Sequence, residues 1–367
     1  MTKRENCQAS KQASKQASKQ ASKQASKQAS KQYNSIDLMK LIMAIVVIAI
    51  HTEPLVRCEK IAVLNLYKAI SDVAVPFFFL ASGFLVFDKV IVLPKEEQER
   101  IILNYAKKIL KLYLIWTVIY LPITIYDYVT NGESLIRNIF AFFKGLIFVG
   151  CHWNSWPLWY LLSVFYAFVL VRLIVYKKGL SQKVLTILAV GVYLIANEFT
   201  IILNNGYELN GFGQQLIKVV SAVFVNGRIF TGFFYIVVGF LMAQYKQLLF
   251  RRKSSEFLFF IAISICGKIA TEGLLERCFL AMLAVSVFCF ILISKVPDCK
   301  YWHTCRNLST KIYLLHMIVY SFLDIVILGD RYANGLMCFV ITIIGTIILS
   351  FGLIYFEKKS KVIEKLF

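Results

Sequence analysis

The sequence predicts an all-α, polytopic integral membrane protein with about ten transmembrane helices and cytoplasmic N- and C-termini. Hydrophobic residues make up 58% and charged residues 17% of its 367 positions, whereas a soluble domain carries about 45–50% and about 25%. The apolar residues form runs about as long as a bilayer is thick. Short basic or polar stretches separate these runs, and their positive charges favour one side. These observations exclude a soluble enzyme, a disulfide scaffold and a disordered chain.

Apolar runs place the ten spans near residues 36–57, 70–93, 104–126, 157–176, 183–203, 228–246, 256–275, 278–295, 308–328 and 335–356. With a cytoplasmic N-terminus, the inside segments hold 29 of the 41 lysines and arginines and the outside segments hold nine. The bias persists without the eight cations before residue 36, so the loops alone predict this orientation. The net charge of +20 therefore indicates a basic cytoplasmic face on a cell-membrane protein. We expect the lipid bilayer, and no nucleic acid, as its partner.

The remaining segments define the domain organisation. Two outer apolar stretches, 135–149 and 215–225, are too short to cross the bilayer and are interpreted as re-entrant or interfacial segments. Residues 8–31 repeat Gln-Ala-Ser-Lys six times, with no apolar face and with like charges four residues apart, which disfavours a helix. The sequence thus predicts a disordered basic tail over residues 1–35 and a membrane domain over residues 36–367. The tail either contacts anionic lipid or has no function, and it lacks the apolar core of a signal peptide.

His51 is the most informative ionisable residue, because a charged group within a span costs about 2.5–3.5 kcal/mol or more. It lies in the outer half of the first span, beside a Thr-Glu-Pro sequence. Histidine titrates near neutral pH and suits a general base; the alternative is a helix-end histidine bonded to a backbone carbonyl. Lys40 shares the helix face of His51 but lies ~16.5 Å away along the axis. It either binds an anionic cofactor at the cytoplasmic rim or snorkels to water.

Other polar residues within the spans have structural alternatives. His316, in the ninth span, is a second candidate catalytic residue or an interhelical hydrogen-bonding residue. The spacing of Lys268 and Glu272 predicts a mutual ion pair. Glu198 and Asp324 lie toward the outer ends of their spans, where they either assist the first-span histidine or face water.

The sequence offers few signs of other chemistry. Most of the nine cysteines fall in apolar runs, where cysteine behaves as a small hydrophobe. Cys299, His303 and Cys305 lack a clear fourth ligand, so no metal site is expected. The His-x4-Asp pattern of glycerolipid acyltransferases and a phosphate-binding glycine loop are both missing from the sequence.

Five sequence blocks occur in a recognisable order. They are Ile36-Asp-Leu-Met-Lys40 with His51-Thr-Glu-Pro-Leu ten residues later, Val75-Pro-Phe-Phe-Phe-Leu-Ala-Ser82-Gly83-Phe84, Pro157-Leu-Trp159-Tyr160-Leu, Arg228-Ile-Phe-Thr-Gly-Phe-Phe-Tyr-Ile-Val-Val-Gly239 and Ser309-Thr-Lys-Ile-Tyr-Leu-Leu-His316. Together they resemble acyltransferase family 3, the membrane O-acyltransferases of surface polysaccharides. The first block is similar to the membrane half of vancomycin-resistance serine racemases. Those proteins append a pyridoxal-phosphate racemase domain, and because this sequence ends at Phe367 we expect no racemase activity.

The resemblance implies an enzyme that moves an acyl group, typically acetyl, from a cytoplasmic donor to an extracytoplasmic hydroxyl or amine, such as that of a cell-surface glycan. Acyl-CoA is the implied donor, as a substrate and not as a tightly bound cofactor. His51 and His316 are the implied catalytic residues. The residues implied to contact the donor or the developing oxyanion are Lys40, Arg228, Ser82 and Tyr313.

Two positions depart from the family pattern and leave alternatives open. Lys40 stands where arginine is typical, which removes bidentate phosphate binding, and Asp72 stands where another arginine is expected. One alternative is membrane transport or binding of a small polar solute such as L-serine. The other is a scaffold without catalysis.

Overall fold

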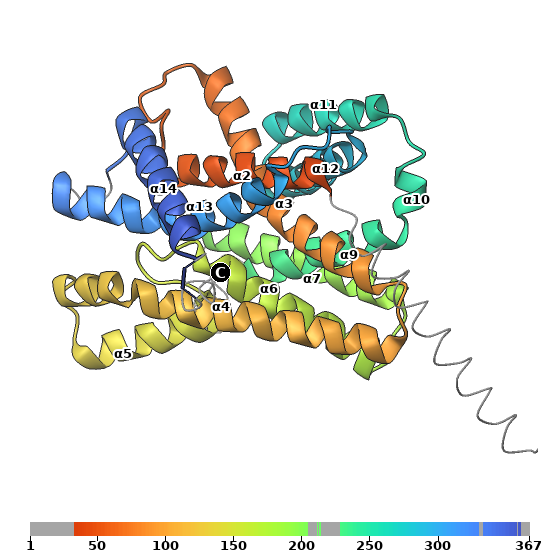
Figure 1. Cartoon of the computed structure of the whole chain (residues 1–367), viewed down its shortest axis with the longest axis horizontal. Helices are drawn as coiled ribbons and strands as arrows, with labels where there is room; N and C mark the ends of the chain where they lie inside the picture. Colours follow the sequence, from red (N-terminus) through yellow and green to blue (C-terminus); the bar gives the residue numbers. More distant parts are fainter. Residues whose placement is uncertain are drawn as a thin grey trace, which may run out of the picture.

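The computed structural model describes residues 33–204, 211, 213, 228–329, 333–357, 359 and 360, and every regular element within them is helical. The residues of the predicted tail up to 32 and the predicted segment at 215–225 lie outside these ranges. The helices that match the ten predicted spans are α2 (Asn34–Thr52), α3 (Ile61–Val90), α4 (Lys95–Thr130), α6 (Leu158–Val171), α7 (Gln182–Asn204), α9 (Arg228–Gln244), α11 (Ser254–Ala270), α12 (Gly273–Ile293), α13 (Trp302–Phe322) and α14 (Leu336–Glu357) (Figure 1). Two of them continue as π-helical turns, α6 into η2 (Arg172–Lys177) and α13 into η4 (Leu323–Ile327).

The all-helical membrane fold is confirmed. Eight helices in the described part of the chain are long and apolar enough to cross a bilayer. The other two, α9 and α11, have 17 residues each, which corresponds to ~26 Å of helix and falls just short of the ~30 Å hydrocarbon core. The count of ten spans and the cytoplasmic placement of the termini therefore stay predictions.

The first helix ends earlier than its apolar run predicts, at Thr52 and not near residue 57. Glu53 adopts a left-handed backbone conformation, with φ 44°, and Pro54 follows it. Proline disfavours a helical conformation in the preceding residue and has no N–H to donate. His51 consequently lies in the last turn of α2, where its side chain is close to the loops that cap the bundle.

The apolar outer segment at 135–149 is helical, as α5 (Leu135–Lys144) followed by η1 (Gly145–Val149). The backbone carbonyls of Leu146 and Ile147 accept hydrogen bonds from the hydroxyls of Tyr113 and Tyr166, at 2.8 and 2.7 Å. Figure 1 shows α5 folded back along the end of α4. This arrangement fits a segment that lies against the bundle, and its re-entrant or interfacial position remains a prediction.

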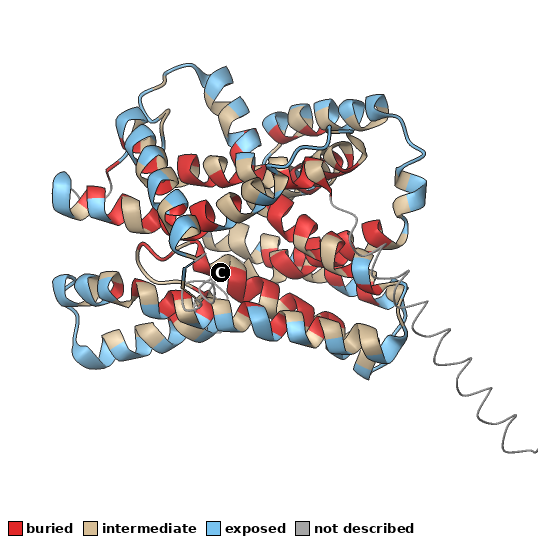
Figure 2. Cartoon of the chain, in the orientation of Figure 1, coloured by how far each residue is buried: buried red, intermediate tan, exposed pale blue. Residues whose placement is uncertain are grey.

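The core lies where α3 crosses α9, with α2, α6, α12 and α13 around them. Gly83 of α3 and Gly239 of α9 permit this crossing: a Cβ at position 83 would lie 2.5 Å from the backbone oxygen of Ile236, and one at 239 would lie 2.6 Å from that of Leu80. Small residues at helix crossings are the usual means of close packing in a membrane. Figure 2 shows burial concentrated at these central helices, whereas the outward faces of α5, α11 and α14 are exposed. The exposed side chains there include many large apolar residues, as a lipid-facing surface requires.

Candidate functional site

Two histidines from distant parts of the sequence lie together inside the bundle. His51, in the last turn of α2, and His316, in α13, stack with ring centroids 5.5 Å apart and an interplanar angle of 24°. The ring of Trp156 lies 5.3 Å from that of His51. His316 is fully buried and His51 is half-buried. The fold thus brings together the two residues that the sequence analysis named as catalytic, although their roles stay a prediction.

His316 carries its proton on Nδ1. The carbonyl oxygen of Ile312 can only accept a hydrogen bond, so its 3.1 Å contact with Nδ1 requires an N–H donor there. In the neutral ring Nε2 then holds a lone pair, and this atom is buried without a hydrogen-bond partner in the part of the chain that the structure describes. An unpaired buried acceptor costs about 1–3 kcal/mol. Nε2 is therefore a favourable place for a substrate proton or a water molecule to bind.

A column of hydroxyl groups leads from the histidines toward the other end of the bundle. The ring of Tyr313 lies 6.2 Å from His316 and 5.5 Å from Tyr160, and Tyr160 Oη lies 2.7 Å from Ser82 Oγ. Because Tyr160 donates its proton to a backbone carbonyl of α3, Ser82 is the donor in that pair. Tyr313 donates to the carbonyl of Pro157 at 3.0 Å. Ser82 and Tyr313 thus lie in one column, and their hydroxyl protons are already engaged within the protein.

Arg228, the first residue of α9, lies close to the histidine pair. One guanidinium nitrogen donates to Cys151 Sγ over 3.4 Å, and the guanidinium carbon lies 5.2 Å from the centre of the Trp159 ring. Arg228 interacts electrostatically with both His51 and Tyr313. A guanidinium has five N–H donors. Of the three oxyanion-stabilising candidates, Arg228 therefore has the most donors left to offer a substrate.

Lys40 lies apart from the other predicted site residues. Its electrostatic neighbours are Asp37, Arg306 and Lys89, and Arg306 donates two hydrogen bonds to Asp37 Oδ2, at 3.1 and 3.3 Å. This cluster is at the start of α2, whereas His51 is at its end. Lys40 is thus part of a cationic group on the side of the bundle that is predicted to be cytoplasmic, and the fold does not bring it to the histidines.

The predicted ion pair between Lys268 and Glu272 is wrong. The helix α11 ends at Ala270, so the two residues do not share a helix, and Glu272 is exposed. Lys268, whose side chain is only 4% exposed, instead pairs with Asp72 at 2.8 Å and with Glu276 at 3.1 Å. A buried ammonium requires such partners. The pairing also places a cation beside position 72. The family pattern leads us to expect an arginine at this position itself.

The loop at 150–157, between η1 and α6, holds groups that the sequence analysis missed. It supplies Trp156 and Cys151, and burial raises the pKa of the Cys151 thiol. Asn154 in this loop is 1% exposed and adopts φ 55°. Neither polar atom of its amide has a hydrogen-bond partner among the described residues. Buried amides are rarely left unpaired, and the Asn-Ser-Trp-Pro sequence before the block at Pro157 was the available signal for an ordered turn.

His152 joins this loop to the α4–α5 hairpin. Its Nδ1 lies 3.1 Å from the hydroxyl of Tyr128, and its ring stacks on Phe142 with centroids 5.0 Å apart. Gly145 makes room for the ring, because a Cβ there would lie 2.3 Å from it. Burial lowers the pKa of His152 to about 4, so the side chain is neutral near pH 7. Its contacts indicate a structural role.

Two other polar residues of the predicted spans, Glu198 and Asp324, lie outside the histidine site. Glu198 is exposed. Asp324 is buried in η4, and its Oδ1 accepts a 2.7 Å hydrogen bond from the backbone N–H of Ala333, which closes the loop before α14. Within the described ranges, no three His, Cys, Asp or Glu side chains gather as a metal site would require.

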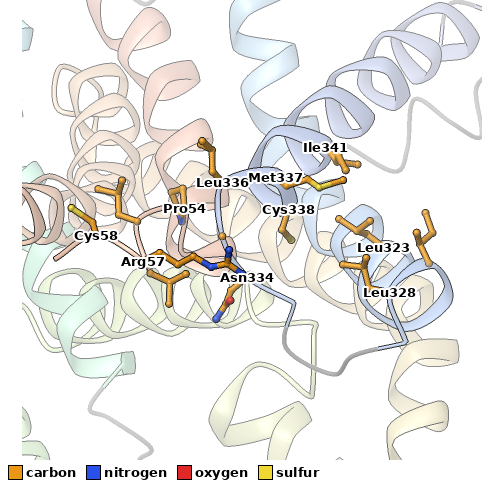
Figure 3. Close-up of a pocket in the computed structure, with 14 residues that line it drawn as sticks. Pro54, Arg57, Cys58, Leu323, Leu328, Asn334, Leu336, Met337, Cys338 and Ile341 are labelled. Atoms are coloured by element: carbon orange, nitrogen blue, oxygen red, sulfur yellow. The ribbon is translucent and has the colours of Figure 1, made fainter.

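Two cavities are relevant to the site. The first, of 630 Å³, is lined mainly by apolar side chains from the loop after α2, from η4 and from the start of α14. In Figure 3 Arg57 and Asn334 are the polar side chains that reach it. The second, of 360 Å³, lies between α3, α6, α7, α9 and α12 and is more polar. Arg228 lines this second cavity, which therefore adjoins the histidine site.

Comparison with known proteins identifies one family and several relatives of this chain. The model of an acyltransferase domain family matches residues 33–355. The chain is 28% identical to a serine/alanine racemase of Enterococcus gallinarum over 84% of its own length and 45% of that protein. It is 24% identical to an amino-acid racemase of Enterococcus faecalis over 90% of its own length and 47% of that protein. The chain thus spans less than half the length of these relatives, and no solved structure matches it.

Proposed function

The chain belongs to the acyltransferase domain family, whose model covers almost all of its helical bundle, and from this premise we propose the reaction that it catalyses. An acyl group, acetyl in the simplest case, passes from acyl-CoA on the cytoplasmic side to a hydroxyl or amine of an extracytoplasmic acceptor. A cell-surface glycan of the producing cell is the proposed acceptor, and the cell membrane is the proposed location.

The observation that carries this proposal is the pair of stacked histidines inside an apolar bundle. An ionisable side chain at such a position is costly and is usually retained for a function. The column of Tyr313, Tyr160 and Ser82 supports the proposal further, because it extends the polar interior toward the side from which the donor is expected.

His51 acts as the general base in the proposed reaction. Its imidazole removes the proton of the acceptor hydroxyl, and the acceptor oxygen attacks the thioester carbonyl carbon. Arg228 stabilises the oxyanion that forms on the carbonyl oxygen. The carbon–sulfur bond then breaks, and the imidazolium returns its proton to the sulfur of CoA. General-base assistance of this kind typically contributes about 10²–10⁴-fold.

His316 supports this base. Its Nδ1–H is anchored to the carbonyl of Ile312, so its ring has one orientation, and its stacking on His51 limits how the catalytic ring turns. The lone pair on Nε2 adds a second proton acceptor within the same site.

The donor's phosphates are proposed to bind the cationic group of Lys40, Lys89 and Arg306. Positive charge at this end of the bundle attracts a phosphorylated nucleotide. Because Lys40 lies ~16.5 Å from His51 along α2, the flexible arm of acyl-CoA has to span the intervening column to present its thioester.

Replacing the base tests this proposal directly. We expect His51→Ala to accumulate and insert normally but to lose acyl transfer, by about 10²-fold or more. Mass spectrometry of surface polymers from cells with each variant measures the transfer. His303→Ala, which changes an exposed histidine, is the matched control and should acylate normally. Acylation retained by His51→Ala would contradict the mechanism.

A second candidate function is transport or binding of a small polar solute such as L-serine. It is favoured by the relatives of this chain, which are a serine/alanine racemase and amino-acid racemases. Uptake of labelled L-serine into vesicles that contain the protein but no acyl donor tests it. Protein-dependent uptake would favour this function, whereas donor-dependent labelling of a glycan would favour acyl transfer.

A further inference from the structure

The 360 Å³ cavity between five helices has the features of a binding site. Its volume is at the lower end of the range of about 300–1,000 Å³ that holds small ligands. Its polar lining includes Asp72, Asn197, Thr200, Arg228, Thr231 and Arg277. These residues come from the halves of α3, α7, α9 and α12 that lie on the same side of the bundle as His51, the side predicted to be extracytoplasmic. A solute of monosaccharide size would therefore enter the cavity from the predicted extracytoplasmic side.

The charges of this cavity favour an anion. The carboxylate of Asp72 is paired with Lys268, and Lys268 also pairs with Glu276. Arg228 and Arg277 have no acidic partner among the residues that the structure describes. Guanidinium groups bind carboxylate and phosphate through paired, charge-assisted hydrogen bonds. Two such groups without counter-ions therefore leave the cavity suited to a negatively charged ligand.

The cavity is also connected to the candidate catalytic site. Arg228 contributes to the cavity lining, and it interacts electrostatically with His51. The ring of Trp159 lies under its guanidinium and lines the same cavity. A ligand held here would present its neighbouring hydroxyl groups toward the histidine pair.

We propose that this cavity binds the acceptor through a carboxylate or phosphate group that Arg277 holds. Arg228 contributes positive charge to the same cavity, and its remaining N–H donors are kept for the oxyanion. The hydroxyl side chains of Thr200 and Thr231 and the amide of Asn197 surround the uncharged part of the ligand. The substrate class is therefore a small, hydroxylated, anionic unit, such as an acidic sugar or a sugar or glycerol phosphate. This assignment rests on the proposed acyl transfer, because it identifies the anion as part of the acceptor.

Ligand binding without any acyl donor tests the site separately from catalysis. The probes are D-glucuronate and glycerol 3-phosphate, each compared with its neutral counterpart, D-glucose or glycerol. Titration calorimetry on the purified full-length chain measures their affinities. We expect at least one anion to bind, and the neutral probes to bind at least tenfold more weakly; which anion binds distinguishes a carboxylate from a phosphate.

Variants locate the binding. Arg277→Gln should weaken binding of the anion about 10- to 100-fold, as expected for the loss of a charge-assisted pair. Arg137→Gln, which removes an exposed arginine paired with Glu133, is the matched control and should bind as the wild type does. If Arg277→Gln does not accumulate, Arg277→Lys keeps the charge and should weaken binding through the loss of bidentate geometry.

Three results would overturn the proposal: neither anion binds, the neutral probes bind as well as the anions, or Arg277→Gln binds with unchanged affinity. His51→Ala should retain anion binding, because the cavity lining does not include His51. Failure of the anion site and failure of the proposed catalysis are thus measured on different variants with different readouts.

Discussion

At the level of single residues, the polar groups around the histidine pair are costly to keep inside an apolar bundle. His316 Nε2 and both polar atoms of the Asn154 amide are buried without hydrogen-bond partners among the described residues. Such groups lower stability unless something else binds them. A substrate or ordered water at these atoms would explain why the protein tolerates them.

Asn154 gives a prediction that separates function from stability. Glycine adopts φ 55° freely, so Asn154→Gly removes the amide without straining the loop, and the free energy of unfolding should change by less than about 1 kcal/mol. If the amide binds substrate, acyl transfer should fall about tenfold, as expected for one hydrogen bond. Thermal melts and glycan acylation measure the two effects, and a large loss of stability with unchanged specific activity would contradict the role.

His152 gives a pH prediction. Burial lowers its pKa to about 4 in the folded protein, against about 6.5 in the unfolded chain. The unfolded state therefore binds the proton more readily, so protonation favours unfolding. The contribution of the neutral His152 side chain to the free energy of unfolding is fully present above pH 6.5. It is lost as the pH falls from 6.5 toward 4.

The comparison of wild type with His152→Asn measures this effect, because both retain the other histidines. Melting temperatures between pH 7.5 and 4.5 should fall more steeply for the wild type. Parallel curves for the two proteins would show that His152 does not contribute to acid destabilisation.

At the level of helices, the crossing of α3 and α9 sets the position of the site. Both helices contribute cavity residues, Asp72 from α3 and Arg228 from α9, and Gly83 lies at a close approach of the two backbones. The bend at Glu53 and Pro54 has a similar effect on α2, since it ends the helix one residue after His51. Two local features, the glycine at position 83 and the end of α2 before Glu53, therefore help to set where the polar side chains of the site meet.

Gly83→Ala should disturb this crossing. The added Cβ would lie 2.5 Å from the backbone oxygen of Ile236, which cannot move as a flexible side chain can. We expect a loss of about 1–3 kcal/mol in the free energy of unfolding, the usual cost of overpacking. Gly191→Ala in α7, where no atom lies within 4 Å of the new Cβ, is the control. Equal melting temperatures for the two variants would argue against a tight crossing.

At the level of the whole molecule, the charge distribution predicts the orientation in the membrane. The loop after α2 should be extracytoplasmic and the loop before α11 cytoplasmic, because lysine and arginine are retained on the inside. In a background without the native cysteines, Arg57→Cys should react with a membrane-impermeant maleimide in intact cells. Lys253→Cys should react only after the cells are permeabilised. The reverse pattern would invert the topology and move the acceptor side to the cytoplasm.

The sequence determined the membrane-helical fold and the approximate position of each helix, because apolar runs of bilayer length are a local property of the chain. It also singled out His51 and His316, since a titratable residue within an apolar run is conspicuous by itself. Arg228 became a candidate only through the resemblance to the family. It misjudged Lys268, because spacing along a sequence predicts an ion pair only when both residues share a helix, and α11 ends between Lys268 and Glu272.

Only the tertiary structure decided which of these polar residues meet. Helix crossings are set by side-chain packing between segments far apart in the chain, and periodicity within one helix carries no information about its neighbour. The stacking of His51 on His316, the pairing of Lys268 with Asp72, and the two arginines that share one cavity all arise in this way. The unpaired amide of Asn154 likewise becomes visible only once the loop at 150–157 is folded against the bundle, because burial depends on everything that packs around a residue.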